Sequence, residues 1–161
     1  MADCGGIMNT IINAAAGIDA QCRTLLECNT VTREHGITLS AHDAAMLASA
    51  RREALRSTGR VEFAGGTAER LVTEFAASPY VTQDSFAEVL AALTELFYLF
   101  KNETGDLISD EALIKYMRRA FDGECRGSVE ALAADALPEL ARRVNRRRAR
   151  NGLSAAEAAD E

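Results

Sequence analysis

The sequence has little of what interrupts a helix. Proline occurs only twice and tryptophan is absent, whereas alanine is abundant. Because proline removes a backbone donor and alanine loses no side-chain entropy in a helix, this composition favours helices. The 161 residues, of which 48% are hydrophobic and 26% charged, fit one globular domain with a core of its own. We therefore predict an all-α fold.

Cysteine and histidine are too sparse to suggest a disulfide framework or a metal site. The four cysteines form no CxxC pair, so we expect reduced thiols. The two histidines, His35 and His42, match no metal-ligand spacing and no nucleophile pair. No run reaches the roughly 20 apolar residues that span a bilayer, and no basic segment marks a signal peptide. We predict a cytoplasmic location, no membrane binding, no cofactor, no metal and no catalytic residue.

Helical periodicity with start and stop signals predicts about six helices. The first runs from about Asp19 to Gly36. The second follows Ser40, which with Asp43 resembles a capping box, and it stops at Gly59. The remaining helices are predicted to start at Thr67, Thr82, Ser109 and Ser128.

The helix predicted for about residues 83–102 is the longest and the most apolar. Its apolar side chains cover more than one stripe, which is typical of the buried centre of a domain. The expected fold is therefore a single compact bundle around this helix. The aromatic run 97–100 is assigned to the core, where Tyr98 alone could reach the surface with its hydroxyl. Pro138, inside the last helix, is expected to kink or divide it.

Three segments fall outside this pattern. Residues 1–18 are predicted to be partly helical or frayed, residues 19–150 to form the helical domain, and residues 151–161 to be a flexible tail. Residues 60–64 alternate apolar and polar side chains over too short a run to establish a sheet. We interpret them as an extended linker held by burial of Val61 and Phe63.

Three stretches, residues 60–66, 78–103 and 109–130, together resemble a family of bacterial cytosolic proteins. The last is the most specific, through the run Phe-Asp-Gly-Glu-Cys-Arg-Gly-Ser at 121–128. The family is common in anaerobic Gram-positive bacteria and is known only as a domain of unknown function. The resemblance covers roughly residues 20–145 and implies no activity, cofactor or catalytic residue.

A glycine pair at a helix start is one candidate ligand site. Gly65, Gly66 and Thr67 would offer free N–H groups to an anion, with Arg60 and Arg70 near in sequence. No phosphate-loop or dinucleotide pattern surrounds them, so a simple helix start is favoured. An anion site here would be the basis of a small enzyme.

The loop from Asp122 to Ser128 is a second candidate. Asp122 and Glu124 fit the first ligand positions of a calcium-binding loop. However, Arg126 occupies the fifth position, and Ala133 stands where a bidentate carboxylate is required. We favour a helix–loop–helix corner in which Ser128 caps the next helix.

Arginines gather near the C-terminus, in a chain whose formal net charge is −6. They could grip nucleic-acid phosphates or pair with an acidic protein, although a solvated helix end is the simplest interpretation. No aromatic residues interleave with them for base stacking. The cluster consists of Arg142, Arg143, Arg146, Arg147, Arg148 and Arg150.

The sequence favours no specific activity. We expect a non-enzymatic accessory or protein-interaction domain with a protein partner or a second copy of itself, as a homodimer. A nucleic-acid-associated regulator that uses residues 142–150 is the alternative, and a small enzyme at Gly65–Thr67 ranks below both.

Overall fold

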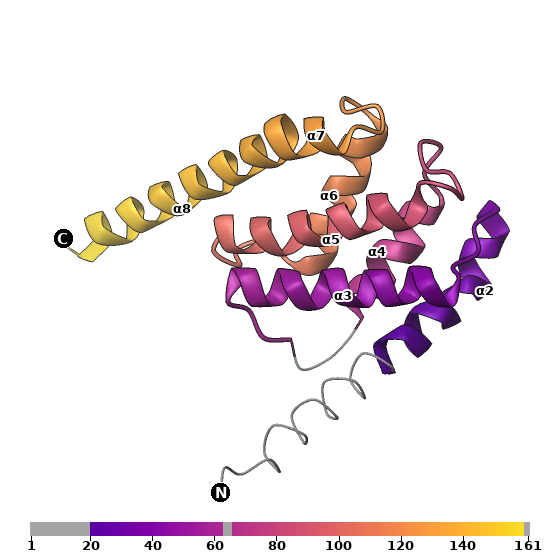
Figure 1. Cartoon of the computed structure of the whole chain (residues 1–161). Helices are drawn as coiled ribbons and strands as arrows, with labels where there is room; N and C mark the ends of the chain where they lie inside the picture. Colours follow the sequence, from indigo (N-terminus) through magenta and orange to yellow (C-terminus); the bar gives the residue numbers. More distant parts are fainter. Residues whose placement is uncertain (1–19, 63–65, 160–161) are drawn as a thin grey trace, which may run out of the picture.

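The computed structural model describes residues 20–62 and 66–159, with the backbone alone for 153–159 (Figure 1). This part of the chain contains no β-strand, and the predicted all-α fold is confirmed. Residues 1–18, Phe63 and Gly65 lie outside the described residues. Residues 20–27 are helical, and the later elements are α2 (Asn29–Thr32), η1 (Arg33–His35), α3 (Ala41–Thr58), α4 (Thr67–Ala76), α5 (Phe86–Glu103), α6 (Asp110–Asp122), α7 (Val129–Ala131), η2 (Leu132–Ala136) and α8 (Leu137–Ala159).

The predicted first helix is divided rather than continuous. It breaks at Cys28, and its last turn, η1, is a 3₁₀-helix that ends at Gly36 in the left-handed conformation. Asn29 is a buried polar residue, and its amide binds the backbone of Leu39. The Asn29 Oδ1 accepts from the Leu39 N–H at 2.7 Å, and its Nδ2 donates to the Leu39 carbonyl at 3.0 Å. This pair fixes the turn into α3.

Local capping signals set the starts of α3, α6 and α7. Ser40 and Asp43 form the predicted capping box, and Gly59 ends α3 in the left-handed conformation. The hydroxyls of Ser109 and Ser128 accept from the N–H groups of Ala112 and Ala131. These interactions join neighbours in sequence, which is why the sequence predicts them.

Helix α5 is the centre of the bundle, in contact with α3, α4, α6, α7 and α8 (Figure 1). It begins at Phe86 and not at residue 83, because Thr82 and Ser85 bond reciprocally through their hydroxyls and N–H groups in a preceding turn. Within the aromatic run two expectations were wrong. Tyr98 is only 2% exposed, whereas Leu99 is 42% exposed on the face of α5 that points to solvent.

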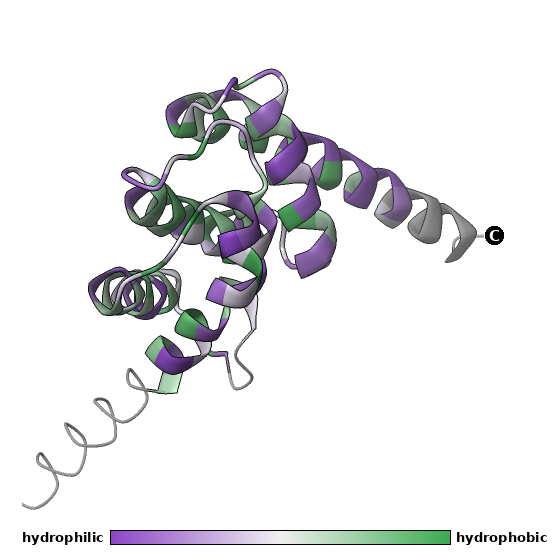
Figure 2. Ribbon diagram, turned by 90° about the vertical axis from the view of Figure 1, so that its right-hand side faces the viewer, coloured by the Kyte–Doolittle hydropathy of each residue, from purple (hydrophilic) through white to green (hydrophobic). Residues whose placement is uncertain are grey.

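The last helix is divided ahead of Pro138, as expected. The division is a five-residue π-helical turn, η2, between α7 and α8. The Tyr116 hydroxyl of α6 donates to the Ala136 carbonyl at 2.9 Å and ties this turn to the bundle. Beyond it, α8 leaves the bundle and points away from it, and its surface there is largely hydrophilic (Figures 1 and 2). The backbone stays helical to Ala159, through most of the predicted tail.

In the linker before α4, Glu62 faces the bundle, whereas we expected Val61 to do so. Val61 is 74% exposed, so its predicted burial was wrong. Side chains on extended backbone alternate, and here Glu62 faces the bundle because three polar partners lie there.

Candidate functional site

Glu62 lies at the junction of three helices. Its Oε2 accepts a hydrogen bond from the Tyr98 hydroxyl of α5 at 2.6 Å and one from the Thr67 hydroxyl of α4 at 3.3 Å. Its Oε1 pairs with the Arg51 guanidinium of α3 at 3.1 Å. Burial, with the hydrogen bond to Glu62, raises the pKa of the Tyr98 hydroxyl far above its usual range. Every polar partner of this carboxylate is a side chain of the same chain.

Arg60, two residues earlier, is engaged at the C-terminal end of α5. Its guanidinium donates two hydrogen bonds to the Asp106 carboxylate, at 2.6 and 3.1 Å, and one to the Asn102 amide oxygen at 2.8 Å. The hydrogen bond from Arg60 lowers the pKa of Asp106. Buried Lys101 binds the same turn through Asp110, at 2.8 Å, and the Ile108 carbonyl. The geometry of this turn therefore rests on charged groups that are already paired.

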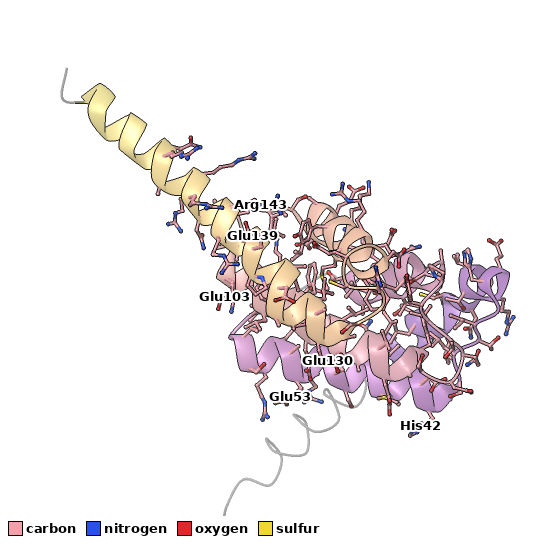
Figure 3. All side chains as sticks on the ribbon, turned by 90° about the horizontal axis from the view of Figure 1, so that it is seen from above. His42, Glu53, Glu103, Glu130, Glu139 and Arg143 are labelled. Carbon is pink, nitrogen blue, oxygen red and sulfur yellow. The ribbon has the colours of Figure 1, made fainter. Side chains whose placement is uncertain are left out.

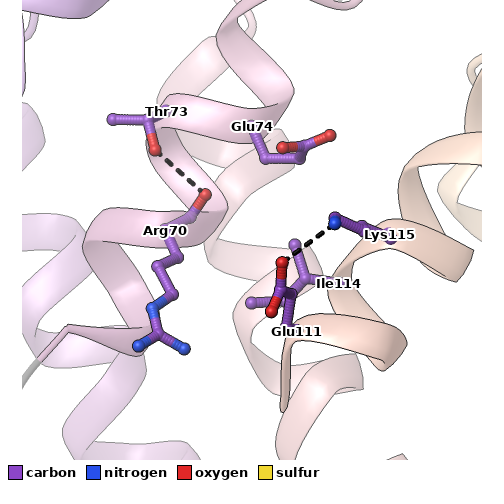
Figure 4. A pocket seen from close by; sticks show the side chains of 6 residues that line it. All are labelled: Arg70, Thr73, Glu74, Glu111, Ile114 and Lys115. Atoms are coloured by element: carbon purple, nitrogen blue, oxygen red, sulfur yellow. Dashed lines mark hydrogen bonds and ion pairs between the residues drawn. The ribbon is translucent and has the colours of Figure 1, made fainter. Parts of the chain in front are cut away.

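Arg70, by contrast, belongs to a different cluster. It lines a cavity of about 380 Å³ between α4 and α6, together with Glu74, Glu111 and Lys115 (Figure 4). Lys115 pairs with Glu111 at 2.9 Å. The described residues of the predicted anion site therefore belong to different clusters. Arg60 pairs with Asp106, the Thr67 hydroxyl pairs with Glu62, and Gly66 begins α4 with no side-chain cap.

The loop after α6 uses its first and last polar residues to join the helices. The Asp122 carboxylate accepts from the Ser78 hydroxyl at 2.5 Å and from the Arg118 Nε at 2.6 Å, so both oxygens face the protein. Ser128 caps α7, whereas Glu124 and Arg126 are exposed. Within 20–62 and 66–159, no cluster of three histidine, cysteine or acidic side chains forms a metal site.

The thiols and imidazoles of the described chain show no sign of an activated nucleophile. Burial raises the pKa of the Cys28 thiol to about 11, which disfavours the nucleophilic thiolate. Burial also raises the pKa of Cys125. His35 and His42 are both exposed.

The arginines of α8 divide into a paired group and an open group. Glu139 lies 3.0 Å from the Arg142 guanidinium and 3.6 Å from that of Arg146. Arg143 donates to the Tyr116 hydroxyl and lies over its ring at 5.8 Å (Figure 3 labels Glu139 and Arg143). The pairs on Arg142 and Arg146 neutralise part of the positive charge that the sequence indicated.

Arg147 and Arg148 form no ion pair with any other described side chain, and they line a groove at the base of the projecting helix. The groove has a volume of about 520 Å³. Sequence reasoning did not identify it, because its two walls are far apart in the chain. The one local signal is an apolar pair, Leu107–Ile108, within a polar loop. The lining residues are Leu107, Ile108, Leu140, Val144, Arg147, Arg148 and Asn151.

None of the described helices is both long enough and apolar enough to cross a membrane. The model of a family of unknown function, DUF6323, matches residues 24–150, and the chain belongs to that family. This agrees with the family resemblance expected over roughly residues 20–145. Comparisons with curated proteins and with solved structures each found no match.

Proposed function

We propose that this member of the family is a non-enzymatic protein-interaction domain, and that α8 is its contact element. The observation that carries the proposal is the position of the open arginines. Arg147 and Arg148 are exposed beside an apolar groove, on a helix that projects from the bundle. Exposed cationic side chains next to apolar surface are typical of recognition sites for proteins.

The polar clusters of the bundle support this choice over a catalytic one. Glu62, Arg60 and Asp122 each bind groups of their own chain at short distances. A catalytic site needs polar groups that converge on a space for substrate. These three residues instead bind other groups of the bundle, which stabilises the packing of α3, α4, α5 and α6.

The proposal is tested by reversing the charge of two exposed arginines of α8, one beside the groove and one beyond it. The full chain and its Arg147→Glu/Arg150→Glu variant are purified under mild conditions after cross-linking, and their masses are measured by light scattering and mass spectrometry. We expect the unaltered chain to carry a protein partner or a second copy, and the variant to lose it. An Arg33→Glu/Arg52→Glu variant, altered at exposed arginines elsewhere, is the control. A strict monomer without a partner contradicts the proposal.

A nucleic-acid-associated regulator is the second candidate, favoured by six exposed arginines on one helix. Mobility shift on random DNA and RNA distinguishes the two. Phosphate binding predicts a shift at low salt that weakens steeply as salt rises. Glu139 lies within this surface and pairs with Arg142 and Arg146, which disfavours a polyanion.

A cytoplasmic location belongs to the same proposal. Cys22, Cys28 and Cys125 are free thiols, and free thiols are typical of reducing compartments. Differential alkylation in freshly lysed cells measures the oxidation state of these cysteines and tests the proposed location. Full reduction is expected.

A further inference from the structure

The groove beneath α8 combines an apolar floor with a cationic rim. Leu140 and Val144 of α8 lie opposite Leu107 and Ile108, which follow the last turn of α5. Leu107 is 54% exposed, an unusual position for a leucine beside the core residue Leu140. Binding a partner here would remove this apolar surface from water.

The charged residues that line the groove are of one sign. Its polar lining residues are Arg147, Arg148 and Asn151, and none of the carboxylates whose side chains the structure describes lines it. The whole chain has a formal net charge of −6, so this rim reverses the average sign of the molecule. Charge complementarity therefore selects an acidic occupant, and the apolar floor requires that occupant to have an apolar face as well.

We propose that this groove binds an acidic amphipathic helix of a partner protein, with leucine-like side chains against Leu107 and Val144 and carboxylates toward Arg147 and Arg148. The inference rests on the proposed function and adds the chemistry of the partner. A helix meets both requirements because residues three and four apart share one face, while acidic residues occupy its flanks. Nucleic acid offers phosphates but no side chain for the apolar floor.

A synthetic peptide tests this chemistry directly. The probe is a fluorescein-labelled helix of about 16 residues, roughly 24 Å long, with leucines on one face and glutamates elsewhere. One control peptide carries the same residues in scrambled order. The other has lysines in place of the glutamates. Binding to the full chain is measured by fluorescence anisotropy at low and moderate salt. We expect saturable binding of the probe and little binding of either control peptide.

Variants of the full chain locate the binding. We expect Leu107→Asp, and separately Arg147→Glu/Arg148→Glu, to weaken probe binding at least about tenfold, since each removes one half of the complementarity. Val61→Asp and Arg33→Glu/Arg52→Glu change exposed residues of the same types elsewhere and should leave binding unchanged. Circular dichroism checks that each variant is folded.

Three results would overturn the inference: no binding of the probe, equal binding of the scrambled peptide, or equal losses in the control variants. Self-association that depends on Leu107 would also overturn it, in favour of a second copy as the occupant. If the probe fails while the cross-linked partner is still lost in Arg147→Glu/Arg150→Glu, the groove chemistry is wrong and the proposed function stands. If both fail, the proposed function fails with it.

Discussion

At the scale of single residues, Glu62 and Tyr98 form the most consequential contact of the bundle. Tyr98 is buried, and its hydroxyl donates to a carboxylate that also pairs with Arg51. A largely buried carboxylate is tolerated only when such partners replace water. Removing one donor therefore leaves part of the desolvation cost without compensation.

We predict that Tyr98→Phe lowers the free energy of unfolding by about 1–2 kcal/mol near neutral pH. Burial raises the pKa of Tyr98 in the folded state above its unfolded value. Its contribution is thus complete below about pH 10, and it is lost above that pH as the unfolded tyrosine ionises. Urea unfolding at several pH values should show a steeper alkaline decline in the unaltered chain than in Tyr98→Phe. Exposed Tyr80→Phe is the control, and parallel declines would contradict the prediction.

Gly127 is required for two independent reasons. Its φ is +78°, in the left-handed region, and a Cβ there would lie 2.5 Å from the Tyr80 Cβ. We predict that Gly127→Ala costs about 3 kcal/mol, combining backbone strain with overlap. Gly36→Ala has a similar φ of +77° with no atom within 4 Å, so it should cost only about 1 kcal/mol. Equal losses in urea unfolding would exclude the contact with Tyr80 as a cause.

At the scale of elements, the sequence predicts structure that depends on residues nearby in the chain. It does not predict structure that depends on residues far away in the chain. The caps at Ser40, Ser109 and Ser128 bond residues three positions away, so their patterns are visible in the chain. The inward turn of Glu62 depends on Tyr98, 36 residues away, and no local pattern favours Glu62 over Val61. The exposure of Leu99 likewise depends on which faces of α5 the other helices cover.

The π-helical turn shows the same limit within one element. Pro138 predicts a kink or a division of the last helix, but it does not predict a π turn. The buried residues before and after the turn do not share one face of a straight α-helix. The wider π turn rotates α8 so that Leu132 and Leu137 both face the core, where each is fully buried. The turn also precedes Pro138, whose ring would clash with a carbonyl of a regular helix.

We predict that the π turn behaves as a one-residue insertion. Deleting exposed Ala134 together with Pro138→Ala should convert η2 into α-helix and keep both sets of buried residues in place. The fold and cooperative thermal unfolding are expected to survive. Deleting exposed Glu95 from α5 is the matched control, because it rotates the following buried residues by about 100° and should prevent folding. Loss of folding in both would show that the π turn is essential.

At the scale of the whole molecule, the chain separates a folded body from a projecting helix end. The buried residues of α8, Leu137, Leu140 and Ala141, all precede residue 145, and Val144 packs against the same core. The groove joins the two parts, since Leu107 belongs to the body and Arg147 to the projecting helix. Its walls are about forty residues apart in sequence, so only the fold makes it visible.

This division predicts that two truncations differ strongly in their effect on stability. A chain that stops after Asn145 keeps these packed residues and loses one exposed ion pair, Arg146 with Glu139, so unfolding should change by less than about 1 kcal/mol. A chain that stops after Glu139 also loses Leu140, Ala141 and Val144, and should lose about 2–5 kcal/mol. Urea unfolding measures both effects. The first truncation should nevertheless bind no acidic helical peptide, because it lacks the cationic rim while retaining a folded body.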